Sequence, residues 1–332
     1  MINVGAGNIQ AIKVGAEDAI KAYQGSTLVW TAGGPVYTAL TCEYLVTTTG
    51  ETKIGGTIAN YCTGMTVDGV DVAAANTYVF ETPGKHIVVW NVDQGGYSNL
   101  DSPIDAFNST YTLKVVHLPS FTAHIGQSAF YHCTGMTECD MSGTAIWGLN
   151  GQAFSRCVSL KEIKLPPCTR LNGHTFDECL GVTSVTFTDA LTTIGDYDFY
   201  RLGENVTANP LEIDIPSGVT SIGEAAFAYS KIDYVHLPEG LQTIGPMAFF
   251  ALYAPDITIP ASVTSLGNSS LGTFNGSGIW FEGSVPPFSP GPYEDQNPFY
   301  PLSSHIAIKV PRGSLAAYQA ACPMYASQME EY

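Results

Sequence analysis

One six-residue pattern recurs along this chain, and it constrains the fold more than any other feature of the sequence. It reads IGQSAF, IGDYDF, IGEAAF and IGPMAF in segments that begin at Ile125, Ile194, Ile222 and Ile244. A repeat of roughly two dozen residues is too short to bury its own apolar face, so each unit must stack on its neighbours. The sequence therefore predicts an elongated solenoid, an architecture that mostly binds other molecules or holds them apart.

Each repeat also contains a strand pattern of two apolar residues separated by one other residue, often followed by proline, as in Ile213–Pro216. A period of two turns the apolar pair inward and the middle residue outward. Proline ends the strand because it has no N–H to donate. We expect the IGxxAF segment to form a short helical or 3-10 turn. The repeat phenylalanines are Phe130, Phe154, Phe176, Phe199, Phe227 and Phe249, and Leu271 takes the next position.

Strand-like alternation outside the repeat indicates a mainly β protein. The 332 residues include 34 glycines and 20 prolines, spread evenly, as expected for many tight turns between short strands. An open solenoid end would aggregate, so a polar cap is expected after the last coil. We predict a short β module over 1–31, an immunoglobulin-like β-sandwich over 36–112, the repeat solenoid over 113–311 and a C-terminal helical cap over 312–332.

Charge and hydropathy exclude two classes of partner. The net charge is −17, from 13 basic and 30 acidic residues, and it repels phosphate backbones and anionic lipid. No apolar run reaches the length of a membrane span, so we predict neither nucleic-acid binding nor membrane insertion. The first ten residues do not resemble a signal peptide. We therefore expect the protein to stay in a cytoplasm unless it leaves by lysis, by an unusual secretion route or after removal of a leader.

Three of the eight cysteines share one position in the repeat. Cys133, Cys157 and Cys179 each lie three residues after a repeat phenylalanine. A small, weakly polar side chain at the same place in successive coils is best explained as a free thiol that lines the core. Disulfides remain an alternative. Zinc lacks its usual spacing because no CxxC pair exists.

No motif of a known catalytic class is present. The seven histidines form no HExxH, and GxSxG, the P-loop and a GxGxxG that opens a helix are all missing. The acidic residues give no reason to pair two carboxylates in one cleft. We predict a non-enzymatic protein with no catalytic residue, no metal site and no cofactor.

The outward strand positions are the candidate binding surface, because solenoids bind through their sheet face. Polar and aromatic side chains there suit a glycan or a protein, although an ordinary solvated sheet face explains them equally. Trp280 is the strongest single candidate, since an exposed indole is costly unless something covers it. The candidate ligand-binding residues are His117, Lys164, Asp214, Tyr234, His236, Trp280 and Glu282.

The repeat resembles a known family. The segments IGEAAF, VHLPEGLQTIG (Val235–Gly245) and VPRGSLAAY (Val310–Tyr318) are similar to the BspA-like leucine-rich repeat family of bacterial surface proteins. The resemblance covers about residues 113–318 and implies a leucine-rich-repeat solenoid. It also implies adhesion or extracellular binding. Asn172-Gly173 in place of Ile-Gly departs from the pattern and argues against a regular binding ladder.

The N-terminal module has a separate resemblance. Its Y-x-G-x-x-x-V-W pattern at Tyr23–Trp30 is similar to modules of virion proteins from tailed phages of gut bacteria. This implies a fibre, decoration or tail appendage, present in several copies or as a homo-oligomer in a virion that assembles in the host cytoplasm. The repeat domain would then bind host-surface glycan or protein. The alternative is a bacterial cell-surface adhesin without its leader. The residues expected to dock on other virion proteins are Ile20, Tyr23, Leu28 and Trp30.

Overall fold

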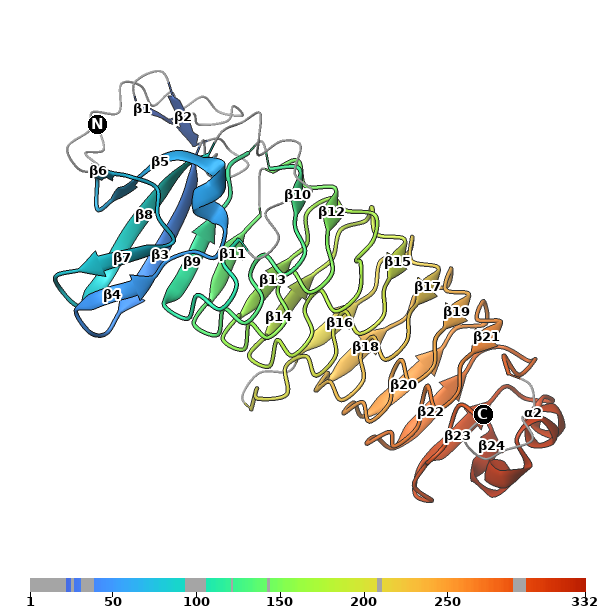
Figure 1. Ribbon diagram of the computed structural model, residues 1–332. Helices are drawn as coiled ribbons and strands as arrows, with labels where there is room; N and C mark the ends of the chain where they lie inside the picture. Colours follow the sequence, from blue (N-terminus) through green and yellow to red (C-terminus); the bar gives the residue numbers. More distant parts are fainter. Residues whose placement is uncertain are drawn as a thin grey trace.

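The protein forms an elongated stack of coils between a sheet-rich N-terminal unit and a small helical C-terminal cap (Figure 1). This is a computed structural model. It describes residues 22–24, 27–30, 39–92, 106–120, 122–141, 144–207, 211–288 and 297–332.

One strand of each coil builds the surface that we call the sheet face. Its strands pair in parallel wherever they are hydrogen-bonded. The middle residues of successive strands lie side by side, since Asp140 is opposite His117 and Asp214 is opposite His236. The strands are β9 (Leu113–His117), β11 (Glu138–Asp140), β13 (Glu162–Lys164), β14 (Ser184–Thr186), β16 (Glu212–Asp214), β18 (Tyr234–His236), β20 (Asp256–Ile259), β22 (Gly278–Phe281), β23 (Ala307–Val310) and β24 (Met329–Glu331).

The Ile-Gly part of the repeat forms a second set of parallel strands, which we call the Ile-Gly ladder (Figure 1). Its isoleucines point into the core and are buried. The glycines allow the coils to approach closely. A β-carbon at Gly245 would lie 2.7 Å from the carbonyl carbon of Gly223 in the preceding coil. The strands are β10 (His124–Ile125), β12 (Gly148–Leu149), β15 (Thr193–Ile194), β17 (Ser221–Ile222), β19 (Thr243–Ile244) and β21 (Ser265–Leu266).

We expect Gly245→Ala to lower the free energy of unfolding by about 1–3 kcal/mol, because the added methyl group forces two backbones apart. Gly148→Ala is the matched control, since its β-carbon would meet no atom closer than the His124 ring nitrogen at 3.7 Å. Urea unfolding of both variants measures the difference. Equal stability of the two variants would contradict close coil contact as the reason for glycine.

The repeat phenylalanines form one continuous stack. Successive rings from Phe107 to Phe249 have centroids 5.1–5.7 Å apart and planes within 3–15° of each other. Phe107 is a member that the sequence pattern did not reveal. Backbone hydrogen bonds show that Leu271 takes the next position, as predicted, and Phe299 the one after it. The described residues therefore contain nine coils with a shared interior.

The IGxxAF segments are turns, and the predicted helical or 3-10 turn is wrong there. Residues two before and two after each ring adopt positive φ, for example Ser128 (φ 54°) and His132 (φ 58°). The left-handed residues redirect alternate N–H groups out of the turn. The N–H groups of Phe130 and His132 donate to Ala153 and Ser155 of the next coil, each at 2.8 Å. The coils are therefore hydrogen-bonded to each other on this side as well, which we call the turn face.

The N-terminal unit continues the solenoid sheet. Strand β3 pairs antiparallel with β9, which gives a six-stranded sheet in the order β11-β9-β3-β8-β5-β6, with β4 and β7 paired beside it. The immunoglobulin-like sandwich predicted for this region is not shown by this arrangement. Alternation indicated buried strand faces but did not specify which strands would pair. The elements are β3 (Leu40–Val46), β4 (Gly50–Lys53), η1 (Ile58–Tyr61), β5 (Cys62–Val67), β6 (Val70–Val72), β7 (Thr77–Phe80) and β8 (Gly84–Val92).

This unit also covers the first coil. Because the turn-face N–H groups point toward the C-terminal end, the carbonyl groups of the first coil point back and need donors. The N–H of Gly56 donates to the Ala106 carbonyl at 2.6 Å. The Lys53 Nζ donates to the Asn108 carbonyl at 2.5 Å. The N-terminal unit therefore caps the solenoid.

The predicted module over 1–31 lies mostly outside the described residues. Within it, β1 (Ala22–Gln24) and β2 (Thr27–Trp30) form an antiparallel pair in which Tyr23 is opposite Leu28. Ile20 lies outside the described residues. The docking role assigned to Ile20, Tyr23, Leu28 and Trp30 stays a prediction.

The C-terminal end carries the expected small helix. It comprises α2 (Leu315–Ala321), η3 (Pro323–Gln328) and the last strand, β24. Tyr318 of α2 is fully buried, and its hydroxyl donates to the Gly283 carbonyl at 2.7 Å. Its ring packs 5.2 Å from that of Phe281. The cap thus closes the apolar interior, as a solenoid end requires.

Candidate functional site

A hollow of about 360 Å³ lies on the sheet face over β18 and β20 and beside the residue that follows β22. We call it the first hollow. Tyr234 and His236 of β18 contribute side chains from alternate positions of one strand, and Thr258 lies on β20. Glu282 borders the hollow from the next coil. Tyr234 is 51% exposed. Three candidate residues from the sequence, Tyr234, His236 and Glu282, are therefore brought together.

The first hollow is acidic. Glu239, Asp256 and Glu282 line it, and no lysine or arginine is among its described lining residues. Partial burial and then the nearby Glu239 carboxylate raise the pKa of Glu282. His236 has its Nε2 3.8 Å from the Asp214 Oδ1, with both side chains largely exposed. The hollow therefore combines an aromatic ring with several hydrogen-bond acceptors and a negative potential.

A second hollow of about 370 Å³ adjoins the first, and Glu282 borders both. Its other walls are mainly apolar and include Val263, Val285 and Pro286. Val285 is 74% exposed. Side by side, the two hollows thus offer an acidic and an apolar compartment.

Two further candidates lie on the same face but several coils away. The His117 Nδ1 on β9 is 3.9 Å from the Asp140 Oδ2 of the neighbouring strand. The Lys164 Nζ on β13 forms an ion pair with Glu162 at 2.7 Å. These residues belong to the predicted outward row, but the structure does not place them in either hollow.

Trp280 was predicted to be exposed, and this is wrong. The Tyr332 ring packs against the indole with centroids 5.1 Å apart, and the Lys309 Nζ lies 5.6 Å from the indole centroid. Trp280 is half-buried as a result. The pattern placed Trp280 correctly on the outward row, but it did not reveal that the C-terminal residue folds back over it.

Two lining residues of the first hollow, Glu239 and Asp256, were not predicted from the sequence. Glu239 directly follows the proline that ends the β18 pattern, and Asp256 is the first residue of β20, two positions before Thr258. The alternation signal identifies Asp256 as outward-facing. No signal identified Glu239, because its position depends on the turn that follows the strand.

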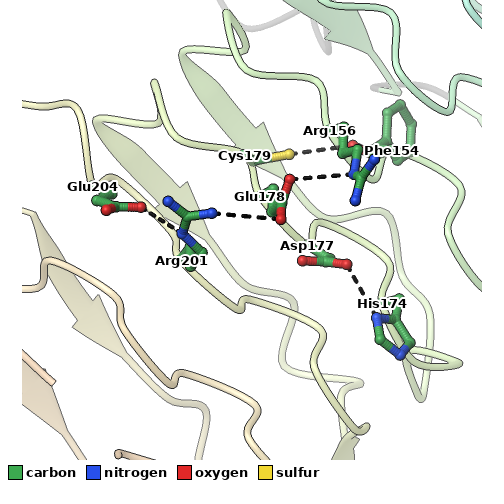
Figure 2. Close-up of polar contacts among 8 residues, drawn as sticks. All are labelled: Phe154, Arg156, His174, Asp177, Glu178, Cys179, Arg201 and Glu204. Carbon is green, nitrogen blue, oxygen red and sulfur yellow. Dashed lines mark hydrogen bonds and ion pairs between the residues drawn. The ribbon is translucent and has the colours of Figure 1, made fainter. Parts of the chain in front are cut away.

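A network of ion pairs on the turn face was also not predicted from the sequence (Figure 2). The Arg156 Nε lies 3.2 Å from a Glu178 carboxylate oxygen, and the other Glu178 oxygen lies 3.5 Å from Arg201. Arg201 also pairs with Glu204 at 2.6 Å. Arg156, Glu178 and Arg201 each lie two residues after a stacked phenylalanine, a signal that would have predicted the row. These partly exposed ion pairs link three coils, and each contributes little to the stability of the fold.

The buried thiols are part of the core. The Cys133 Sγ donates to the Phe107 carbonyl at 3.0 Å, and Cys157 and Cys179 make the same bond to the preceding coil. Figure 2 shows the bond from Cys179 to Phe154. All three cysteines are buried and free, which confirms the prediction. Burial raises the pKa of the Cys133 thiol to about 12, so these groups are poor nucleophiles.

The described part of the chain has neither a metal-binding cluster nor a membrane-spanning helix. There, no three His, Cys, Asp or Glu side chains are grouped so as to hold a metal ion. Across the same residues, no helix combines the length and the apolar character needed to cross a bilayer.

The stacked rings, the parallel sheet face and the Ile-Gly ladder define a leucine-rich-repeat solenoid. The chain belongs to the BspA type leucine-rich repeat region family, which matches residues 103–205 and 205–285 in six copies. This match spans more than half of the chain and confirms the family resemblance of the repeat.

Several solved structures are similar to part of this chain. The pneumococcal vaccine antigen PcpA is 15% identical, with 66% of each chain covered and a TM-score of 0.39. A leucine-rich repeat protein from Eubacterium ventriosum is 21% identical, with 62% of this chain and 61% of that chain covered and a TM-score of 0.38. A leucine-rich cell surface protein from Faecalibacterium prausnitzii is 22% identical, with 61% and 57% covered and a TM-score of 0.37.

The chain spans less than two thirds of the length of the Eubacterium and Faecalibacterium chains and 66% of that of PcpA. No curated protein matches it in sequence. None of the comparisons supports the virion role predicted from residues 1–31. The family match agrees with the alternative prediction, a bacterial surface-type repeat protein.

Proposed function

We propose that this protein is a non-enzymatic, adhesin-like binding protein of the bacterial cell surface. Its sheet face engages a macromolecule of the host surface. The family match supports the class. The observation that carries the binding role is the first hollow, where Tyr234 and His236 of β18 and Glu282, which follows β22, meet around about 360 Å³.

The first hollow is preformed. Tyr234, His236 and Thr258 stand on strands β18 and β20, which pair with β16 and β22 respectively and not with each other. The coils of β18 and β20 are joined by the hydrogen bond from the Ile232 N–H to the Tyr253 carbonyl and by the bonds of the turn face. A ligand therefore does not have to order this surface before it binds, which reduces the entropic cost of association. An exposed tyrosine beside carboxylate and hydroxyl groups is typical of recognition sites, since the ring supplies contact area and the polar groups supply orientation.

We expect Tyr234→Ala to weaken ligand binding about tenfold or more, as for an aromatic residue at the centre of a recognition site. Binding is measured on arrays of host-surface glycans and extracellular host proteins, followed by titration of each hit. Tyr253→Ala is the matched control, because Tyr253 is 57% exposed and does not line the first hollow. Hits that bind both variants as well as the unaltered protein would show that the first hollow is not the binding site.

Surface location needs its own test. An antibody raised against the described sheet-face strands should label intact cells of the encoding bacterium. Labelling only after lysis would contradict a surface protein. Recovery of the protein in purified phage particles would replace this proposal with the virion role.

A further inference from the structure

We propose that the two adjoining hollows bind an extended polypeptide segment of a partner protein, with a lysine or arginine in the first hollow and a nearby apolar side chain in the second. This inference rests on the proposed function, because it names the ligand class of the same site. Three features carry it: acidic groups that have no lysine or arginine partner among the described residues, an exposed apolar wall and a shared border.

The carboxylates of the first hollow lack cations. In the described residues, neither Glu239 nor Glu282 forms an ion pair with a lysine or arginine, and the one potential cation in the lining is His236. Other glutamates on the sheet face do have such partners, as Glu162 has Lys164 at 2.7 Å and Glu330 has Lys309 at 2.5 Å. A cation supplied by a partner would relieve the repulsion between like charges.

The aromatic ring fits the same ligand. Tyr234 is half exposed at the wall of the first hollow and presents a π face to whatever enters. Ammonium and guanidinium groups are attracted to such faces. A neutral glycan would leave the carboxylates uncompensated, and an acidic glycan would be repelled, so a basic polypeptide is the favoured occupant.

The second hollow offers a binding site for an apolar side chain of the same partner segment. Val285 exposes 74% of its surface beside Val263 and Pro286. Burial of such a side chain by a partner is favourable, at about 25 cal/mol for each Å² removed from water. Because Glu282 borders both hollows, one extended segment, which advances about 3.3 Å per residue, reaches both compartments within a few residues.

The test uses the full chain and a yeast-displayed library of random dodecapeptides. We expect enrichment of peptides with lysine or arginine close to an apolar residue, and the enriched sequences are then synthesised and titrated. The double variant Glu239→Gln/Glu282→Gln should bind them at least about tenfold more weakly. A single Glu138→Gln variant is the control, because it removes one exposed carboxylate from β11, several coils away. Val285→Ser should reduce the preference for apolar residues while the basic preference remains.

The outcomes separate this inference from the proposed function. Enrichment of peptides without basic residues, or equal binding by the double variant and the control, would overturn the inference. Binding of glycans that depends on Tyr234, with no peptide enriched, would overturn the inference and leave the proposed function standing. Absence of binding to glycans, host proteins and peptides alike would overturn both.

Discussion

Replacement of Phe199 by alanine is expected to lower the free energy of unfolding by about 3–5 kcal/mol, the cost of a cavity left by a buried phenylalanine. The Phe199 ring is fully buried between Phe176 at 5.7 Å and Phe227 at 5.2 Å, and Phe187 meets its edge at 5.6 Å. Alanine would remove contacts with both neighbouring coils at once. Because each coil of a solenoid is stabilised mainly by its neighbours, the loss weakens the coupling between the two halves.

Urea unfolding followed by far-UV circular dichroism measures this loss. We expect the parent protein to unfold in one transition, and the Phe199 variant to unfold at lower urea or in two transitions. Tyr111→Ala is the control for removal of an aromatic ring, since Tyr111 is 53% exposed. If the free energy of unfolding of the Phe199 variant fell by less than about 1 kcal/mol, the stacked rings would not form one energetically coupled core.

Asp198→Ala is expected to cost about 2–4 kcal/mol, although the change restores the alanine of the repeat pattern. Asp198 is fully buried. Its carboxylate accepts the N–H of Thr175 at 3.1 Å and that of Gly195 at 2.6 Å. Alanine would leave these two donors without an acceptor, at about 1–3 kcal/mol for each buried group. The preceding coil departs from the pattern at Asn172, and Asp198 accepts the N–H of Thr175 in that coil.

The same carboxyl group makes stability depend on pH. Burial raises the pKa of Asp198 to about 6, and the hydrogen bonds from Thr175 and Gly195 offset only part of this effect. The folded-state pKa is above the unfolded value of 3.8. The stabilisation of the fold by protonated Asp198 is therefore fully present below about pH 4, and it is lost as the pH rises through about 6. The total change is about 3 kcal/mol.

Thermal unfolding from pH 4 to pH 7 measures both the loss of stability in Asp198→Ala and the pH dependence that Asp198 causes. The parent protein should lose stability over this interval relative to Asp198→Asn, which does not titrate. Asp189→Ala removes an exposed carboxylate nearby and should leave the pH profile unchanged. A parent profile parallel to that of the asparagine variant would contradict the raised pKa.

The repeat pattern was sufficient to predict the interior of the solenoid. The spacing of Phe130 to Phe249 and the cysteine three residues later follow the period of one coil, so any stack of identical coils must align them. Phe107 and Phe299 were not predicted as members of the stack, because they lie outside the run of regularly spaced phenylalanines. The predicted conformation of the turn was wrong. The IGxxAF pattern does not indicate that residues such as Ser128 and His132 adopt positive φ, which directs N–H groups to the next coil.

The candidate site was predictable only in part. Strand alternation placed Tyr234 and His236 on the outward row, because the side-chain period of a strand is fixed at two. The same rule placed Trp280 there, but not the Tyr332 ring that covers it. The family match confirms the class of the repeat and leaves the docking role of the N-terminal module untested.

The sequence by itself determined the coil, its inward and outward positions and the row of rings and thiols, because these depend on contacts that recur at a constant spacing along the chain. Only the tertiary structure decided where the two hollows lie, how β3 pairs with β9 to cap the first coil, and that the Tyr332 ring covers Trp280. Those features depend on departures from the repeat and on segments far apart in the chain. A periodic pattern carries no information about either.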